Sequence, residues 1–441
     1  MKETKFKQTL VQTKDERRKT KESTRYCEER SDVAIQSGFK MTEVGMIPSD
    51  WEVKKVSDVA FNFTGLTYTP FDVRDYGTLV LRSSNIQNEQ LCFFDNVYVD
   101  MDIPERALVK DGDILVCVRN GSKALIGKSA LVSLKGEKIA FGAFMTILRA
   151  KENVCNIFLL YSWQSNLLQN QVQESLGATI NQITNSDFQR YYIALPPTIE
   201  EQQRIANALS DVDALIANLE KLIAKKKNIK QGAMQQLLTG KKRLPGFAGK
   251  WSDFVLGQSG FLLKNSINPQ FSATKYFSEY SMPAYDEIQK PERVLGCSMH
   301  SNRTQISGEV LLFNKLNVRQ KRVWYVRKCA ENAVCSMEFL PYCSQKIDLQ
   351  LLRQILLTDE VTFDFIGMST GTSNSQKRIA PKNFLDYSLR LPQDIREQKA
   401  IAEILVDMDS EIQALNKKII QYRKLKTGMM QQLLTGKIRL V

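Results

Sequence analysis

The chain contains 441 residues, a length that predicts two or three domains rather than one. It is 43% hydrophobic but has no apolar run of the roughly 18–20 residues that a membrane-spanning helix needs, so we expect a globular protein without a membrane partner. A formal charge of +13 favours a polyanionic partner, and the single histidine, His300, argues against Ser-His-Asp, Cys-His and multi-histidine metal chemistry.

Residues 1–40 are predicted to be a disordered and dispensable extension. The segment is polar, strongly charged and poor in core-forming residues. It also lacks the apolar stretch of a secretory signal.

The cysteines predict a cytoplasmic protein without bound metal. Eight cysteines are present, and none forms a CxxC pair. The closest group, Cys329, Cys335 and Cys343, has neither the spacing of a zinc site nor a histidine among its members. Reduced thiols of this kind are typical of the cytosol.

Residues 41–194 form a first variable block, which is predicted to be a mixed α/β domain. Short β-branched runs divided by Gly, Asn and charged residues predict strands. These runs are GTLVLRSSNI, GDILVCV, SALVSL and AFMTILRA. The segment VCNIFLLYSWQSNLLQNQVQ, residues 154–173, predicts a helix.

The stretch NGSKALIGKSAL, residues 120–131, comes close to a phosphate-binding loop because Gly127-Lys128-Ser129 follows a strand-like run. A Walker A loop needs another glycine at the position of Ser122 and a helix after the lysine. The SALVSL run that follows predicts a strand instead. We therefore do not expect a nucleotide site.

Residues 195–245 and 391–441 are predicted to be two long helices. In each, apolar residues alternate in steps of three and four, which is typical of a coiled-coil seam. The seam residues are Ile205, Leu209, Val212, Ile216, Leu219, Ile223, Ile401, Leu405, Met408, Ile412, Leu415 and Ile419. Each helix should begin after Pro197 or Pro392 and end near Gly240 or Gly436. We expect an antiparallel pair within one chain, and the alternative is a zipper between two chains.

The chain is an internal two-fold repeat. MQQLLTGKKRL at 234–244 returns as MQQLLTGKIRL at 430–440, a shift of 196 residues, and about half of the positions from 195 to 244 are identical at this shift. The same shift places Phe188 on Phe384. A second variable block, residues 246–390, repeats the α/β style with GEVLLFNKL, RVWYVR, AVCSMEFL and the helical IDLQLLRQILL.

Polar and basic residues near the strand-like runs of both blocks are candidates for DNA contact. Arg, Lys, Asn and Ser reach phosphates and base edges, although any one of them could equally belong to a solvated turn. The candidates are Arg82, Ser83, Asn85, Arg119, Asn120, Ser122, Lys123, Asn302, Arg303, Lys315, Asn317, Arg319, Lys321 and Arg322.

This arrangement resembles the specificity (S, HsdS) subunit of Type I restriction–modification systems over roughly residues 41–441. The resemblance rests on the LP and EQ pairs that start the helices, the two QQLLTG ends, and the Gly-Asp strand of the first block. The pairs are Leu195, Pro196, Glu201 and Gln202, with Leu391, Pro392, Glu397 and Gln398. It implies two target recognition domains, 41–194 and 246–390, that each read half of a bipartite double-stranded DNA site, joined by an antiparallel coiled coil that sets the spacer.

The resemblance also implies partners. Two methyltransferase (M) subunits would dock on the helices, and restriction/translocase (R) subunits would join them. Candidate docking residues are Gln235, Gln236, Leu237, Leu238, Gln431, Gln432, Leu433 and Leu434. S-adenosylmethionine, ATP and Mg would bind to the partners, and this chain would bind no cofactor and catalyse no reaction. Accordingly, the sequence has no [DNS]-PP-[YFW] tetrapeptide, and LPPT at 195–198 is the nearest match.

Two other functions remain open at the level of sequence. One is an enzyme with its own P-loop or nuclease chemistry, for which loss of ATP binding in Lys128→Ala would be evidence. The other is a coiled-coil nucleic-acid-binding scaffold without a methyltransferase partner, for which binding independent of sequence would be evidence.

Overall fold

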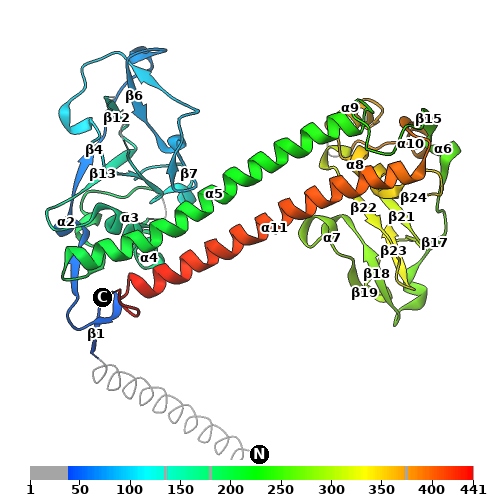
Figure 1. Cartoon of the computed structure of the whole chain (residues 1–441). Coiled ribbons are helices and arrows are strands. Elements are labelled where there is room, and N and C mark those ends of the chain that lie inside the picture. The colour runs from blue at the N-terminus through cyan, green and yellow to red at the C-terminus, as the bar shows by residue number, and fades with distance from the viewer. Residues whose placement is uncertain are drawn as a thin grey trace, which may run out of the picture. The chain divides into compact units, whose positions relative to one another are not determined.

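The protein is described from a computed structural model (Figure 1). It covers residues 38–440 except 134, 135, 137, 178–180, 372, 374 and 375. The chain divides into two compact units, Met1–Asn218 with Ile419–Val441 (unit 1) and Leu219–Lys418 (unit 2). Residues 1–37 of the predicted extension lie outside the described residues.

The strands of unit 1 lie mainly in two four-stranded sheets, as far as the described residues show. The order β11-β10-β13-β4 is antiparallel throughout, and β12-β6-β9-β5 has one parallel pair, β12 with β6. Their bounds are β4 (Ala60–Thr64), β5 (Val73–Arg74), β6 (Thr78–Leu81), β9 (Tyr98–Val99), β10 (Ile114–Cys117), β11 (Ser129–Leu131), β12 (Ile139–Phe141) and β13 (Met145–Ala150). Each of the four predicted runs contains one of these strands.

Three strand pairs complete unit 1. They are β1 (Phe39–Thr42) with β2 (Gly45–Pro48), β3 (Glu52–Lys55) with β14 (Tyr192–Leu195), and β7 (Ile86–Gln87) with β8 (Gln90–Leu91). The predicted end of the disordered extension at residue 40 is wrong, because Lys40 pairs with Ile47 in the first hairpin. Gly45 makes this turn possible with a φ of 94°, a backbone conformation that suits glycine.

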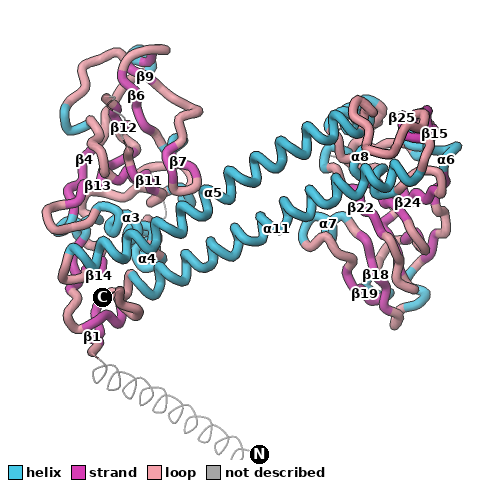
Figure 2. The backbone as a smooth tube through the Cα atoms, viewed as in Figure 1, coloured by secondary structure: helices cyan, strands magenta, loops and turns pink. Residues whose placement is uncertain are grey.

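The helix predicted for residues 154–173 is two helices. α3 (Asn156–Gln164) ends at Ser165, whose hydroxyl then caps α4 (Asn166–Ser175) by accepting the N–H of Leu168 at 3.3 Å. A short helix, α2 (Val56–Val59), precedes β4. Trp163 of α3 is fully buried and stacks on Phe188 with ring centroids 5.7 Å apart, so α3 packs into the core of this domain. Helices α3 and α4 are both seen beside the strands in Figure 2.

The described part of unit 2 repeats the two-sheet plan with one additional strand. The sheets have the orders β16-β24-β21-β22 and β17-β20-β23-β18-β19, and β15 pairs with β25. The strands are β15 (Trp251–Val255), β16 (Gly260–Leu262), β17 (Ser266–Ile267), β18 (Tyr276–Tyr280), β19 (Glu292–Leu295), β20 (Arg303–Gln305), β21 (Val310–Asn314), β22 (Val323–Val326), β23 (Ala333–Ser336), β24 (Phe339–Ser344) and β25 (Ser388–Pro392). The helices are α6 (Leu256–Ser259), α7 (Met282–Glu287), α8 (Leu349–Leu356), α9 (Asp359–Gly367) and α10 (Pro381–Leu385).

Two helices of 39 residues each, α5 (Ile199–Leu237) and α11 (Ile395–Leu433), confirm the predicted rods. In each unit the first half of one helix packs against the second half of the other, so the helices are antiparallel (Figure 1). In unit 1, Ile205 and Leu209 share a core with Leu433 and Leu434. The helices are therefore not separate domains, because each contributes one half to each unit.

Most predicted seam residues are buried, and Leu219, Met408 and Leu415 are half-buried. Two lysine–aspartate pairs cross between the helices at equivalent positions. Lys230 Nζ lies 2.6 Å from Asp409 Oδ1 in unit 2, and Lys426 Nζ lies 2.9 Å from Asp213 Oδ1 in unit 1. A polar pair at one place along an apolar seam favours a single register.

The EQ pair at the start of each helix has a structural role. Glu397 is fully buried and accepts two hydrogen bonds from Arg243, at 2.6 and 2.7 Å. Glu201 accepts the equivalent pair from Arg439. The Gln202 amide oxygen accepts the N–H of Cys155, so it links the helix start to the recognition domain.

Candidate nucleic-acid interface

In unit 1, the loop after β10 collects several of the predicted DNA-binding side chains. Ser122 and Lys123 are exposed, and Asn120 is half-buried. The Asn120 amide donates to Ser83 Oγ at 3.2 Å, and Asn120 Oδ1 accepts the N–H of Ser122 at 3.0 Å. Ser83 and the loop 119–123 are therefore adjacent.

Two cations of this loop face solvent. Lys123 begins the turn η4 (Lys123–Leu125), and the Arg119 guanidinium lies over the Phe144 ring at 5.2 Å from its centroid. Within the described part of the chain, no carboxylate forms an ion pair with either side chain. Both are therefore available to an anion such as a phosphate.

A second segment that the sequence analysis missed completes this surface. Asn120 N–H donates to the Asn181 carbonyl at 3.4 Å, and the Asn181 side chain donates back to the Gly121 carbonyl at 3.2 Å. The Ile183 N–H donates to Val118 O at 2.8 Å. The polar residues that follow, Thr184 and Asn185, line a hollow beside the end of β10.

Unit 2 builds the same two-segment arrangement after β21. The Asn317 N–H donates to the Lys377 carbonyl at 2.8 Å, and the Ile379 N–H donates to the Lys315 carbonyl at 3.0 Å. Lys377 and Arg378 thus lie beside the predicted loop. The sequence contained a signal for this segment, because Ile183 and Ile379 are 196 residues apart, the shift of the internal repeat. In the structure both isoleucines are buried.

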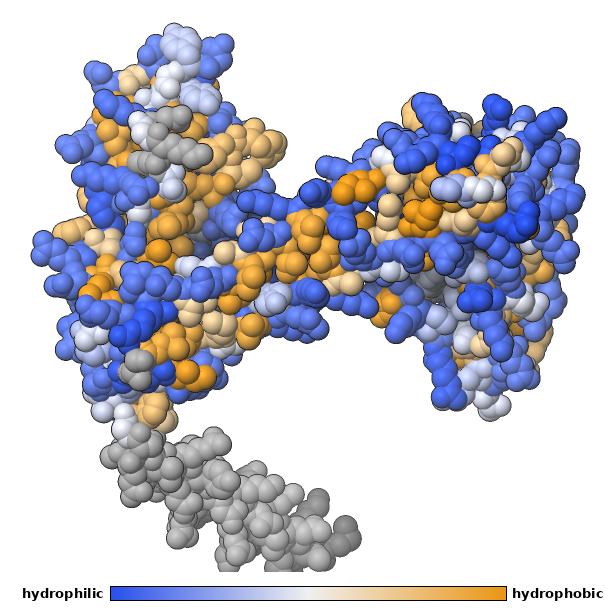
Figure 3. Space-filling view, in the orientation of Figure 1, coloured by the Kyte–Doolittle hydropathy of each residue, from blue (hydrophilic) through white to orange (hydrophobic). Residues whose placement is uncertain are grey.

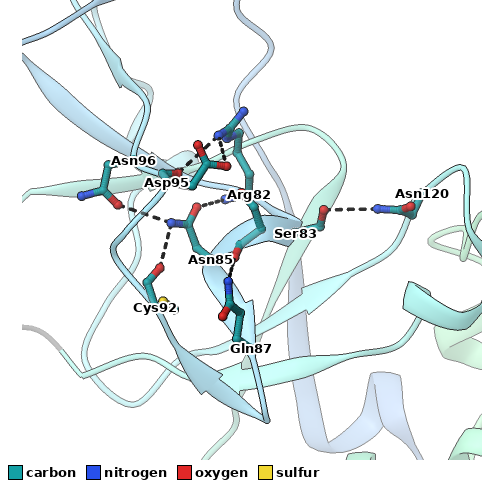
Figure 4. A network of polar contacts seen from close by, with 9 residues as sticks. Arg82, Ser83, Asn85, Gln87, Cys92, Asp95, Asn96 and Asn120 are labelled. Carbon is teal, nitrogen blue, oxygen red and sulfur yellow. Dashed lines mark hydrogen bonds and ion pairs between the residues drawn. The ribbon is translucent and has the colours of Figure 1, made fainter. Parts of the chain in front are cut away.

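Arg82 and Asn85 hold a loop in place and do not present free groups to a ligand (Figure 4). The Asn85 side chain is fully buried, accepts the Arg82 N–H at 2.9 Å and donates to the Cys92 carbonyl at 3.0 Å. The Arg82 guanidinium pairs with Asp95 at 2.9 Å. The prediction that Asn85 contacts DNA is therefore wrong for this conformation, because burial leaves its amide no access to a ligand.

Three predicted cations of unit 2 are also used within the fold. The Arg303 guanidinium pairs with the buried Glu279, and Lys321 pairs with Asp359. The remaining one, Arg322, donates two hydrogen bonds to Asp286, at 2.8 and 2.6 Å, which lowers the pKa of that carboxyl. The candidates left with solvent access are Asn302 and Arg319, which are exposed, and Lys315 and Asn317, which are half-buried.

Comparisons with known proteins agree with this duplicated architecture. Residues 48–231 match the family model of the Type I restriction modification DNA specificity domain. The chain is 25% identical over 406 residues to the type I restriction enzyme EcoKI specificity subunit of Escherichia coli, a match that covers 85% of each chain. It is also 25% identical over 434 residues to the putative MjaX specificity subunit of Methanocaldococcus jannaschii, which covers 92% of this chain and 97% of that relative.

Over most of its length the chain is similar to type I specificity subunits. Solved structures support the fold assignment. The S subunit of a type I restriction–modification system from M. genitalium covers 87% of this chain and 96% of its own, with a TM-score of 0.57 and 14% identity. A chain from a study of complex assembly and conformational transition of the type I R-M system has a TM-score of 0.53 and 16% identity, covering 89% of this chain and 99% of its own.

The Gly-Lys-Ser stretch leads directly into a strand. Ser129 begins β11, as predicted, so no helix follows the lysine. Lys128 Nζ donates to the Ile86 carbonyl at 2.8 Å, and burial lowers the pKa of this amine. Gly127 has a φ of 84° and its carbonyl accepts the indole N–H of Trp163 at 2.7 Å, so this turn fastens the loop to α3.

The cysteine group of this chain is buried or half-buried. Burial raises the pKa of Cys329 to about 11 and that of Cys335 to about 12, so both thiols are protonated at neutral pH. Among the described residues, no cluster of three His, Cys, Asp or Glu side chains could hold a metal ion. Nor does any described helix combine the length and apolarity needed to cross a bilayer.

Three of the four leucines predicted as docking residues are buried and therefore not accessible to a partner, whereas Leu238 stays a prediction. Leu237, Leu433 and Leu434 are buried and pack into the cores of their own units, because they occupy the inward face of the last helical turn. Leu238 is half-buried against the same core as Leu237. The glutamines at 235, 236, 431 and 432 are exposed, so their role in docking stays a prediction.

Proposed function

We propose that this chain is the sequence-specific DNA-binding subunit of a type I restriction–modification complex, in which each recognition domain reads one half of a bipartite double-stranded site. The observation that carries this proposal is the repeated two-segment surface. Loop 119–123 with segment 181–185, and loop 315–319 with segment 377–378, follow equivalent strands in the two units and offer amides, hydroxyls and cations. These groups suit base edges and phosphates in DNA.

The proposed role is recognition without catalysis. The comparisons name specificity subunits, and the scaffold alternative is not favoured by them. We assign S-adenosylmethionine, ATP and Mg to partner subunits, and we place the protein in the cytoplasm, where it would bind DNA.

We assign two methyltransferase subunits and the restriction/translocase subunits as partners. The space-filling view shows apolar side chains on the exposed side of the long helices (Figure 3). Leu222 and Ile229 are 37% and 48% exposed in unit 2, and Ile420 and Leu425 are 54% and 50% exposed in unit 1. Exposed apolar residues on a helix are a common feature of protein interfaces, so we propose this side for methyltransferase docking.

We also propose that the helices set the spacer between the half-sites. A helix of 39 residues is roughly 58 Å long at about 1.5 Å per residue. Half-sites one turn of DNA apart are separated by about 34–36 Å, which is within this length.

Base-resolution methylation mapping in a methylation-free host tests the function. The subunit is expressed with and without the methyltransferase encoded beside its gene. The expected result is N6-methyladenine in both halves of a split motif with a fixed spacer, only when both proteins are present. A stable complex that gives no methylation, or methylation without a split motif, would contradict the proposal.

A further inference from the structure

Two adjacent phenylalanines protrude from the first recognition domain. Phe93 and Phe94 lie in the connection between β8 and β9 and are 47% and 80% exposed. Exposed phenylalanine rings give up the stabilisation that burial of a large apolar side chain provides. Two consecutive exposed rings therefore indicate a surface that meets a ligand.

The backbone on both sides of these rings is clamped. On the N-terminal side, the Cys92 N–H donates to the Asn85 carbonyl at 2.8 Å, and the Cys92 carbonyl accepts from the buried Asn85 amide at 3.0 Å. On the C-terminal side, Arg82 holds Asp95 (Figure 4). The rings are thus presented by a fixed loop, which reduces the entropy lost on binding.

The preceding hairpin is also anchored. The turn between β7 and β8 contains Asn88 and Glu89 with φ values of 51° and 63°, and the Glu89 carboxylate lies 2.8 Å from Lys426 Nζ of α11 in the same unit. Burial opposes the charge of Lys426, but the carboxylates of Glu89 and Asp213 outweigh it and raise the pKa of the amine. The ion pair therefore persists at neutral pH and fixes the start of the loop.

The clamp is continuous with the proposed DNA surface. Arg82 and Asn85 flank Ser83, which hydrogen-bonds to Asn120 at 3.2 Å (Figure 4). The carboxylate that follows the rings in the sequence, Asp95, is paired with Arg82. The segment that carries the rings is thus joined through Arg82, Asn85 and Ser83 to the polar loop 119–123.

We propose that Phe93 and Phe94 make the apolar base contacts of the first half-site, an inference that rests on the proposed function. A ring without hydrogen-bonding groups can distinguish bases by packing on the thymine methyl group in the major groove. It can also act as a wedge between base pairs. Positions 196 residues later hold Gln289 and Lys290, so the effect is confined to one half-site.

Phe71 of the same unit provides a matched control. It is 86% exposed, and its segment is bonded to the residue after β9, because the Asp100 N–H donates to the Asp72 carbonyl at 3.0 Å. The variant tests whether loss of any exposed phenylalanine weakens DNA binding, and we expect that it does not.

The experiment compares wild type, Phe93→Ala/Phe94→Ala, Phe94→Ser and Phe71→Ala, each assembled with the methyltransferase subunit. Fluorescence anisotropy measures binding to a duplex with the mapped site and to duplexes with either half randomised. We call Phe93→Ala/Phe94→Ala and Phe94→Ser the tip variants. Both should lose roughly tenfold in affinity for the intact site, which is typical of one base contact, while Phe71→Ala should bind like wild type. Once the first half is randomised, the tip variants and wild type should bind equally.

Deoxyuridine in place of thymine in the first half-site separates the two modes of contact. If the rings contact the thymine methyl group, deoxyuridine should lower the affinity of wild type but not that of the tip variants. If the rings act as a wedge, these variants should lose the same affinity relative to wild type on the thymine and the deoxyuridine duplexes. Unchanged affinity of both tip variants for the intact site would overturn the proposal. Loss of methyltransferase assembly with intact DNA binding would also overturn it, in favour of a protein contact. Absence of bipartite methylation by wild type would instead contradict the proposed function.

Discussion

Single residues in this chain have roles that their chemistry alone does not reveal. Arg243 and Arg439 occur in the same repeated motif, and both bind a buried glutamate at the start of the opposite helix. Arg82 is also an arginine and was predicted to contact DNA, but it pairs with Asp95 and supports a loop. Only the pairing partner separates a structural arginine from one that is free to bind phosphate.

Replacing Arg243 with alanine should destabilise the protein strongly. The change leaves Glu397, which has no solvent exposure, without its partner, and an unpaired buried charge is costly. We expect the unfolding midpoint to fall by about 5 °C or more in a thermal melt. The matched control is Arg396→Ala, whose guanidinium is 81% exposed and pairs with Asp394, and it should change the midpoint by about 1 °C or less. Equal effects of the two changes would contradict the structural role.

Substitution of Lys123 should affect DNA binding, whereas substitution of Asn85 should affect folding stability. Lys123→Ala removes an exposed cation, so DNA binding should weaken and its salt dependence should fall by about one unit, with stability unchanged. Asn85→Ala leaves buried backbone groups unsatisfied and should cost about 1–3 kcal/mol of unfolding free energy. Urea denaturation and a salt series of binding isotherms measure both. A Lys123 variant with an unchanged salt slope would remove this residue from the interface.

At the scale of elements, the sequence predicted what depends on local pattern. The long helices begin and end within a few residues of the predicted positions because their apolar seam, the prolines before them and the glycines after them are all local signals. The break at Ser165 was missed because a serine inside an amphipathic pattern is compatible with a helix. The contact between Asn120 and Asn181 was missed because it joins segments about 60 residues apart, and no local pattern encodes such a pairing.

A charge in the helical seam should disrupt the helix pair. Ile216 is 9% exposed, so Ile216→Glu buries a carboxylate with no partner and should cost about 2–4 kcal/mol. Ala214→Glu is the control, because the nearby Ala214 is exposed on the same helix. Circular dichroism melts and methylation mapping provide the readouts. If the Ile216 variant keeps wild-type stability and the same spacer, the seam does not hold the helices together.

At the scale of the whole molecule, duplication gives each unit its own core and its own candidate interface. The surface of unit 1 is built from loop 119–123 and segment 181–185, and that of unit 2 from loop 315–319 and segment 377–378. Each surface is assembled from residues of a single variable block. The helices, in contrast, are shared by both units, so they link the domains without taking part in either surface.

Exchange of one variable block should therefore alter one half of the methylated motif. When residues 246–390 are replaced by the corresponding block of a relative with a different target, the junctions fall before β15 and within β25, which pair with each other and close the domain. The register of the helices is retained, because Lys230–Asp409 and Lys426–Asp213 lie outside the exchanged segment. We expect methylation mapping to show a new second half, the original first half and an unchanged spacer. A change in both halves would mean that the two domains read the site jointly, and a change in the spacer would mean that the variable blocks, rather than the helices, determine it.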